Sequence, residues 1–307
     1  MNMLDIFTSV YGRLHNYGLP FWMMTPFRRV VRGLANCMLP MYLAKPQKCS
    51  NKQDEKLIVS LTSFPARIDI VWIVIECLKR QTILPKKIIL WLSEEQFPNG
   101  SGIPTKLKDM EDDIFEIRLV PGDVRSHKKY LYAIMEFPED TIITVDDDVY
   151  YNSQMIEILV NTSIKYPNCI IANEVSHISY ASDGCILPYL QWGNKKKYSG
   201  KTNLLQIGIG GVLYPPHCMH PLVTNEEVFS TVAPLADDIW LNSMARLMRT
   251  DVVKAPGNLL LLPIKSNSPS LSSVNNGNEN MNDQQISQIR DYLRNNGYDD
   301  VYDINFR

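Results

Sequence analysis

The sequence predicts an α/β fold in which a mostly parallel central sheet is flanked by helices. Short apolar runs alternate with segments of helical periodicity over about 115 residues, and this alternation is typical of parallel strands joined by crossover helices. In addition, three consecutive aspartates follow one of the apolar runs directly. Because ligands bind outside the carboxyl ends of such strands, we expect the binding site at that edge of the sheet.

Short apolar runs predict the strands, since runs of this length are typical of buried strands. The expected strands are residues 57–61, 87–92, 115–120, 141–145 and 169–172. Apolar residues that recur every three or four positions predict the helices. The expected helices are residues 68–80, 103–112, 127–137, 153–166, 234–248 and 284–295.

Composition divides the chain into three parts. Residues 1–50 form a basic, amphipathic segment, and residues 56–265 carry the pattern of the main α/β domain. Residues 266–307 combine an Asn- and Ser-rich stretch, expected to be a mobile loop, with a terminal helix. Residues 174–206 are expected to form loops and a small hairpin, with a solvated turn at the three lysines 195–197.

Overall composition excludes several classes of protein. The chain has 31 Lys and Arg against 33 Asp and Glu, whereas a general nucleic-acid binder normally has a strong basic excess, so we expect no nucleic-acid partner. No apolar run reaches the roughly 18 residues of a membrane span, which excludes a polytopic membrane protein. The six cysteines form no CxxC pair, and no secretory signal is recognisable. We therefore expect reduced thiols and a cytosolic location.

The first 50 residues are more basic than the rest. They carry six Lys and Arg and the single acid Asp5, a net charge of +5. Between Pro26 and Leu39 the apolar and basic positions segregate onto two faces of a helix. Such a helix can lie in an anionic membrane interface, or it can dock on the rest of the protein. Amphipathicity alone does not separate the two hypotheses.

The strongest chemical feature is the acidic triplet Asp146-Asp147-Asp148, which follows the strand expected at 141–145. Carboxylates about 4 Å apart repel by about 1 kcal/mol in water and by more at lower dielectric. A divalent cation, Mn²⁺ or Mg²⁺, bound with a phosphate would offset this cost, because both ions prefer oxygen ligands. An exposed acidic turn is the alternative, and we favour the metal site.

The acidic triplet resembles the Asp-x-Asp signature of GT-A fold glycosyltransferases, where it forms part of the nucleotide-sugar site. Four further segments resemble motifs of that family in the same order. They are a first strand with its nucleotide-binding turn, a helix start before the acidic strand, a glycine-rich acceptor-side strand and a late acidic motif that begins a helix. These segments are residues 57–67, 126–130, 208–216 and 236–240.

The five motifs most resemble bacterial capsule and surface-polysaccharide glycosyltransferases, with a distant likeness to exostosin-type transferases. The resemblance covers residues 57 to about 250. It implies a GT-A-like fold and a metal-dependent, hexosyltransferase-type enzyme. It further implies a nucleotide-sugar donor, with a UDP-sugar preferred, and a growing, lipid-linked cell-surface glycan as acceptor. With the basic N-terminal segment, it predicts a cytoplasmic protein that is peripheral at the inner face of the membrane.

The resemblance assigns donor-binding roles to three groups of residues. Asp148 and Asp146 would bind the metal, Asp146 also facing the ribose or uracil, and Asp147 would assist through water. Thr62 and Arg67, in the turn after the first strand, would contact the nucleotide.

The basic residues have alternatives. Arg67 could instead form a surface pair with Asp69. Either Lys128 or Lys129 would reach the base, ribose or phosphate, and the other lysine would be solvated.

The late motifs are assigned to the reacting sugar and the acceptor. Gly208, Gly210 and Gly211 would let a sugar approach the backbone, or they mark a bend or bulge in a strand. Asp238 matches the base of inverting relatives, which takes the proton of the acceptor hydroxyl, with Asp237 in reserve. Helix capping is the alternative for this pair. Since exostosin-type relatives are retaining, the stereochemistry stays open.

Two other functional classes fit part of the sequence. A sugar nucleotidyltransferase uses a similar sheet, but it usually carries a glycine-rich, basic loop after the first strand. Residues 62–67 contain no glycine, which argues against this class. A non-catalytic carbohydrate-binding or scaffold protein would tolerate replacement of Asp148 by Asn.

Overall fold

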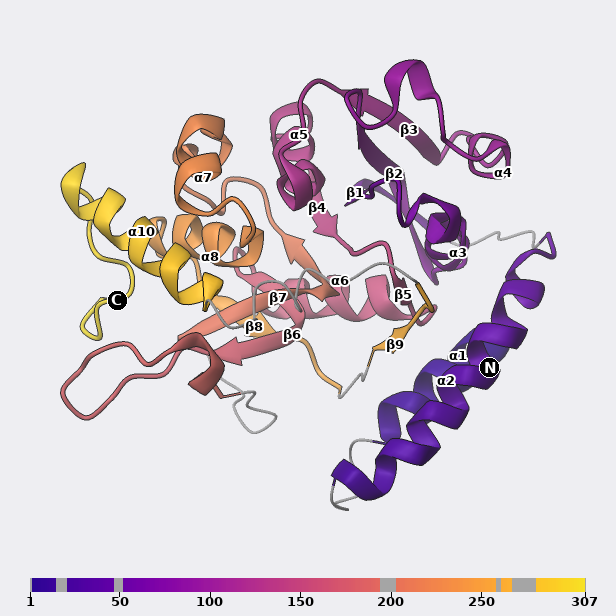
Figure 1. The fold of residues 1–307 in the computed structure, drawn as a ribbon, viewed down its shortest axis with the longest axis horizontal. Coiled ribbons are helices and arrows are strands. Elements are labelled where there is room, and N and C mark those ends of the chain that lie inside the picture. Colours follow the sequence, from indigo (N-terminus) through magenta and orange to yellow (C-terminus); the bar gives the residue numbers. More distant parts are fainter. Residues whose placement is uncertain are drawn as a thin grey trace.

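The computed structural model describes residues 2–14, 21–46, 52–193, 203–257, 261–266 and 280–306 of the chain. Its centre is a seven-stranded sheet with the order β3-β2-β1-β4-β7-β6-β8 (Figure 1). The strands are β1 (Lys52–Thr62), β2 (Ile83–Ser93), β3 (Phe115–Val120), β4 (Thr141–Thr144), β6 (Ile170–His177), β7 (Leu204–Tyr214) and β8 (Val252–Lys254). Neighbours run parallel except β7, which is antiparallel to both β4 and β6.

Helices cover both faces of this sheet. They are α3 (Ile68–Lys79), α4 (Thr105–Lys108), α5 (Lys128–Glu136), α6 (Met155–Lys165), α7 (Glu226–Val232), α8 (Asp237–Leu247) and α10 (Met281–Asn295). Successive strand residues point to opposite faces. On β7, Leu213 lies in the core with α3 and α6, whereas Val212 and Tyr214 lie in the core with α5, α8 and α10. The prediction of a mostly parallel sheet flanked by helices is confirmed.

A two-stranded ribbon lies beside the main sheet. It pairs β5 (Val149–Tyr150), directly after the acidic triplet, with β9 (Leu262–Pro263). Asn36 holds this ribbon from the N-terminal part of the chain. Its amide donates to the carbonyl of Pro263 at 3.2 Å, and its carbonyl oxygen accepts from Lys265 N at 2.7 Å and from the Tyr150 hydroxyl at 3.4 Å.

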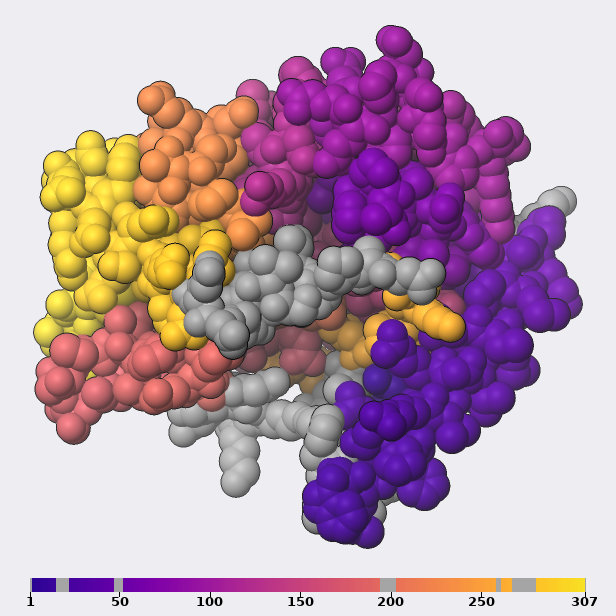
Figure 2. All heavy atoms as spheres, in the orientation of Figure 1, coloured from indigo at the N-terminus to yellow at the C-terminus, as the bar shows by residue number. Residues whose placement is uncertain are grey.

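The N-terminal helix pair consists of α1 (Met3–Arg13) and α2 (Phe21–Leu43), which pack together along one side of the domain (Figures 1 and 2). Leu4, Leu39 and Leu43 are buried in the same core as α3 and α6. Asp5 accepts hydrogen bonds from the backbone N–H and the hydroxyl of Ser153, at 2.9 and 2.8 Å. One face of the pair is therefore docked on the domain. None of the described helices combines the length and apolarity that crossing a membrane requires.

The C-terminal helix is part of the domain. Ile286, Ile289 and Leu293 of α10 are buried in the core formed with α7 and α8. The turn predicted at 195–197 and most of the Asn- and Ser-rich loop lie outside the described residues. The region predicted to be irregular after residue 174 is ordered as strand to His177, because β6 continues its pairing with β7.

Candidate active site

The acidic triplet lies where β4 ends, at the carboxyl edge of the parallel strands. Val145 N–H still donates to the carbonyl of Ser60 on β1, at 3.1 Å. Beyond it, the backbone N–H of Asp146 donates to the Tyr151 hydroxyl at 2.9 Å, and this hydroxyl donates to the carbonyl of Ile209 on β7 at 3.0 Å. Tyr151 thus ties the turn that carries the triplet to the neighbouring strand.

Asp147 points into the protein rather than toward solvent. Its carboxylate accepts from the Ser63 hydroxyl at 2.5 Å and from the Arg67 guanidinium at 2.8 Å. Arg67 is itself buried and also pairs with Asp148 at 2.8 Å. The alternative of a surface pair with Asp69 is therefore wrong. Arg67 and Asp147 connect the turn after β1 to the turn after β4.

Lys129 joins the two acidic motifs. It lies in the first turn of α5, and its ammonium is 3.0 Å from Asp146 Oδ1 and 2.9 Å from Asp237 Oδ2. Burial works to lower the pKa of Lys129, but Asp146, Asp237 and Asp238 together raise it well above its ordinary value. The side chain therefore stays charged although it is almost completely removed from water.

The late acidic pair, Asp237 and Asp238, begins α8, and both side chains make contacts inside the protein. The N-cap residue of α8 is Ala236, which makes no side-chain cap bond, so simple capping by the aspartates is not observed. Asp237 faces Lys129. Asp238 Oδ2 accepts from the N–H of Gly208 on β7 at 3.0 Å. Its buried Oδ1 has no hydrogen-bond partner in the part of the chain that the structure describes.

The two carboxylates of α8 have opposite pKa shifts. Burial works to raise the pKa of Asp237, but Lys129 and His127 more than offset it, so this pKa lies below its ordinary value. Burial and the charge of Asp237 raise the pKa of Asp238 to about 7. Asp238 can thus take up and release a proton near neutral pH, which is the property of a general base.

Asp146 and Asp148 are the carboxylates of the triplet that fit a cation. Their side chains are 31% and 23% exposed, against 7% for Asp147. Burial and the charge of Asp146 raise the pKa of Asp148 to about 6, and a cation bound beside both carboxylates would offset their repulsion. One or two carboxylates together with substrate phosphates are a usual ligand set for Mg²⁺. No group of three or more His, Cys, Asp or Glu side chains among the described residues could hold a metal ion alone.

The cluster as a whole is negative. Among the described residues, Arg67 and Lys129 are the cations paired with it, and five carboxylates against these two cations leave a formal excess of three negative charges. Those five carboxylates are Asp146, Asp147, Asp148, Asp237 and Asp238. A free diphosphate would be repelled by this excess. An anionic ligand could bind beside these carboxylates only if a cation offset their charge.

Of the three glycines on β7, Gly208 borders the acidic side chains. A Cβ there would lie 3.0 Å from Asp238 Oδ1 and 3.1 Å from Lys129 Nζ. At Gly210 a Cβ would meet β6, and at Gly211, where φ is +86°, it would meet α6. These two glycines allow close packing beside a register shift between β6 and β7. They therefore fit the alternative of a strand bulge, and their predicted contact with a sugar has no support in this geometry.

Thr62 and Lys128 have local partners. The Thr62 hydroxyl, at the end of β1, donates to the carbonyl of Trp91 on β2 at 2.8 Å. Lys128 is buried and pairs with Asp123. The expectation that one of the two lysines is solvated is wrong, because both lysine side chains are buried and each is paired with a carboxylate.

Sequence reasoning missed several residues that support the site. Besides Ser63 and Tyr151, His127 fixes the start of α5 by bonding the Tyr130 hydroxyl at 2.7 Å and the carbonyl of Ala233 at 2.8 Å. Burial lowers the pKa of His127 to about 4, so its ring is neutral at physiological pH. Ser63 and His127 lie inside the motifs 57–67 and 126–130, and Tyr151 follows the acidic triplet by three residues. Their supporting roles depend on contacts with distant residues, which the motifs do not show.

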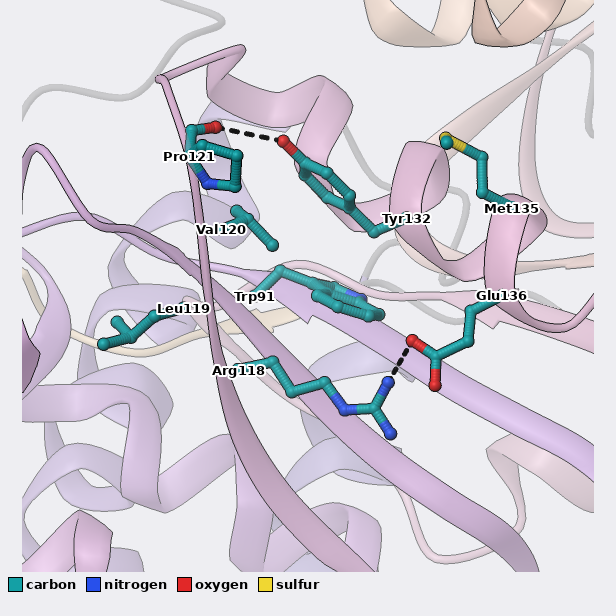
Figure 3. A pocket seen from close by; sticks show the side chains of 8 residues that line it. All are labelled: Trp91, Arg118, Leu119, Val120, Pro121, Tyr132, Met135 and Glu136. Atoms are coloured by element: carbon teal, nitrogen blue, oxygen red, sulfur yellow. Dashed lines mark hydrogen bonds and ion pairs between the residues drawn. The ribbon is translucent and has the colours of Figure 1, made fainter.

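A separate hollow of about 560 Å³ lies between β2, β3 and α5 (Figure 3). Arg118 and Glu136 face each other across it and form an ion pair. Its wall includes Trp91 and Tyr132, whose ring centroids are 5.4 Å apart. None of the five acidic residues lines this hollow, so we do not place the reaction there.

Comparisons with known proteins leave the family open. No protein-family model and no curated protein matches this sequence. The chain is similar to the solved mannosyltransferase PcManGT from Pyrobaculum calidifontis in complex with GDP-Man and Mn²⁺, at 8% identity and a TM-score of 0.47, covering 97% of this chain and 76% of that one. For HddC from Yersinia pseudotuberculosis the identity is 13% and the TM-score 0.35, covering 55% of this chain and 78% of that chain. For UTP-bound UGPase from Acinetobacter baumannii the identity is 10% and the TM-score 0.35, covering 67% of this chain and 87% of that chain. Likenesses at TM-scores below 0.5 assign no function.

Proposed function

We propose that this protein is a metal-dependent glycosyltransferase, which moves a sugar from a nucleotide-diphosphate donor to a hydroxyl group. One observation carries the proposal. Two acidic motifs, about 90 residues apart in the sequence, meet at Lys129 at the carboxyl edge of the sheet. One motif offers two partly exposed carboxylates that fit a cation, and the other offers Asp238 with a pKa of about 7. The five sequence motifs support the same function.

The donor end of the site is formed by the acidic triplet. Asp146 and Asp148 would hold Mn²⁺ or Mg²⁺, which when bound neutralises the negative charge of the diphosphate. Arg67 positions Asp148 through their ion pair, and Lys129 positions Asp146. Asp147 acts as a positioning residue, because its carboxylate is taken up by Ser63 and Arg67.

Asp238 serves as the base in this proposal. It takes the proton of the acceptor hydroxyl as that oxygen forms a bond to the anomeric carbon. The bond from the anomeric carbon to the phosphate oxygen breaks, and its electron pair leaves with the nucleoside diphosphate. Attack from the face opposite the leaving group inverts the anomeric configuration. Asp237, kept ionised by Lys129, helps to hold the pKa of Asp238 near neutrality.

The resemblance of the motifs supports a more specific form of the proposal. A UDP-sugar is the preferred donor, and the acceptor is a growing, lipid-linked cell-surface glycan. The transfer of a hexose would take place at the inner face of the membrane.

Thermal melting of the full chain with UDP, GDP, CMP and dTDP, each with and without Mn²⁺, tests the donor site. A ligand at 100 times its Kd adds about 2.7 kcal/mol of stability, so we expect a clear rise in Tm with UDP plus Mn²⁺. D148N should lose this rise, and D109N, at an exposed surface position, should keep it. An unchanged Tm with every nucleotide, in a folded sample, contradicts the proposal and favours a scaffold protein.

The products separate the two enzyme classes. A glycosyltransferase incubated with its donor and acceptor releases a nucleoside diphosphate and forms a glycoside. Release of pyrophosphate from a nucleoside triphosphate and a sugar phosphate would instead identify a nucleotidyltransferase.

A further inference from the structure

The N-terminal helix pair has a second face on which apolar side chains are exposed. On α2, exposed apolar side chains recur every three or four positions, which places them in one stripe along the helix. The stripe consists of Met23, Phe27, Val30, Leu34, Met38 and Met41. At 1.5 Å per residue it is about 27 Å long. Trp22, which is 73% exposed, stands at its N-terminal end.

Exposed large apolar side chains are concentrated on the N-terminal helix pair among the described residues. Nine of the sixteen large apolar side chains found exposed among the described residues belong to α1 or α2, Ile6 and Val10 of α1 included. The docked face of α2 is separate from this stripe, since Ala35, Leu39 and Leu43 are buried. Docking on the domain and exposure of an apolar face are therefore both properties of this helix pair.

The positive charge of the helix pair indicates which kind of partner fits its exposed face. Arg13, Arg29 and Arg32 are exposed. The only acid in the first 50 residues, Asp5, is bound to Ser153. A second copy of this chain would bring two positively charged helix pairs together, which Coulomb repulsion disfavours. An anionic surface with an apolar interior can attract the positive charges and also bury the apolar stripe.

We propose that the exposed apolar face of α1 and α2 binds the surface of an anionic lipid bilayer, with the helix pair lying in the interface. The apolar side chains enter the boundary between headgroups and acyl chains, and Trp22 lies at headgroup level, as aromatic residues do at membrane interfaces. The arginines attract the anionic headgroups over about one Debye length. The inference stands on this surface alone and does not require the proposed enzymatic activity.

Sedimentation of the full chain with vesicles tests this surface. We expect binding to phosphatidylcholine vesicles that contain phosphatidylglycerol, and much weaker binding to phosphatidylcholine alone. The double variant F27S/L34S should reduce the partition coefficient by about tenfold or more. R29Q/R32Q should reduce it by up to about fivefold per arginine, the factor that corresponds to 1 kcal/mol. I164S, at an exposed apolar residue on α6, should bind as the wild type does.

Three outcomes would overturn the inference. The first is wild-type protein that stays in the supernatant with both kinds of vesicle, and the second is F27S/L34S that binds as well as the wild type. The third is a wild-type dimer in solution that F27S/L34S converts to monomers, which would assign the stripe to a second copy. All substituted positions are exposed, so the variants are expected to fold, and their Tm values verify this.

Discussion

Lys129 and Arg67 are buried cations, and each faces more than one carboxylate. Lys129 pairs with Asp146 and Asp237, which lie in separate segments, whereas Arg67 pairs with two adjacent aspartates of the acidic triplet. Breaking such a buried pair leaves an uncompensated charge in the protein interior, which is costly. The two side chains therefore hold the acidic residues in place as well as balancing part of their charge. The positions of Asp146 and Asp237 relative to each other depend on one ammonium group.

The residue types of the site could be predicted, but their orientations could not. An acidic run after a buried strand is visible in the sequence, and so is the acidic pair that begins α8. That Asp147 turns inward depends on Ser63 and Arg67, which lie about 80 residues earlier. Local periodicity gives no information about contacts over such distances.

The raised pKa of Asp238 predicts how stability depends on pH. Folding raises this pKa from its ordinary value to about 7, so the native state binds the proton more tightly than the unfolded state. Between about pH 4 and pH 7 this group therefore makes the protein less stable as the pH rises. Free energies of unfolding in urea, measured without divalent cations at about pH 5 and pH 8, should show the decline.

D238N removes this titrating group and should make the difference between the two pH values smaller. Asp148, whose pKa is raised to about 6, contributes a further part of the decline and remains in the variant. D109N should leave the difference as in the wild type. A D238N protein with the full wild-type decline would show that Asp238 keeps an ordinary pKa.

At the scale of elements, apolar patterns located the centres of strands better than their ends. β3 was predicted with its observed bounds, because its whole length pairs with β2 inside the sheet. β1 begins five residues before its predicted start, since the polar stretch from Lys52 pairs with β2 at the exposed margin. A strand that continues beyond the core carries no apolar signal.

Gly208 on β7 predicts a steric limit at the site. In G208A the new methyl group would stand 3.0 Å from Asp238 Oδ1 and 3.1 Å from Lys129 Nζ, so the two charged groups must move. We expect the rate of transfer to fall by at least about tenfold. The affinity for UDP, obtained from the Mn²⁺-dependent rise in Tm, should fall by a similar factor. A tenfold change corresponds to a displacement that costs about 1.4 kcal/mol.

The matched control is G33A in α2, where a Cβ meets nothing within 4 Å. Alanine is a better helix former than glycine, so G33A should stabilise the protein by about 0.5–1 kcal/mol and leave the activity unchanged. Equal activities of G208A and the wild type would argue that the acidic pair of α8 lies outside the reacting site.

At the scale of the whole molecule, the N-terminal helix pair and the α/β domain share one core. We expect them to unfold in a single transition, because Leu39 packs in the same apolar cluster as α3 and α6. L39A should lower the free energy of unfolding by about 2–5 kcal/mol. Tryptophan fluorescence and far-UV circular dichroism should report the same midpoint of unfolding in urea.

L34A, at an exposed position of the same helix, should change the free energy of unfolding by less than about 0.5 kcal/mol. A separate, earlier transition of the helices in L39A, with the main transition unmoved, would show that the helix pair folds independently. The sequence left the choice between docking and exposure open, because a helical pattern does not tell which of two apolar faces meets the domain.

The hydrogen bonds of Asn36 to the ribbon connect the helix pair to the strand that follows the acidic triplet. A protein bound to a bilayer through α2 would therefore carry its reacting groups at a constant height above the lipid. Enzyme and anchored acceptor would then meet by lateral diffusion in the membrane plane. The effective concentration of the acceptor would be set by its density on the surface. Turnover would fall when the same number of acceptors is spread over more inert lipid, although their concentration in the tube is unchanged.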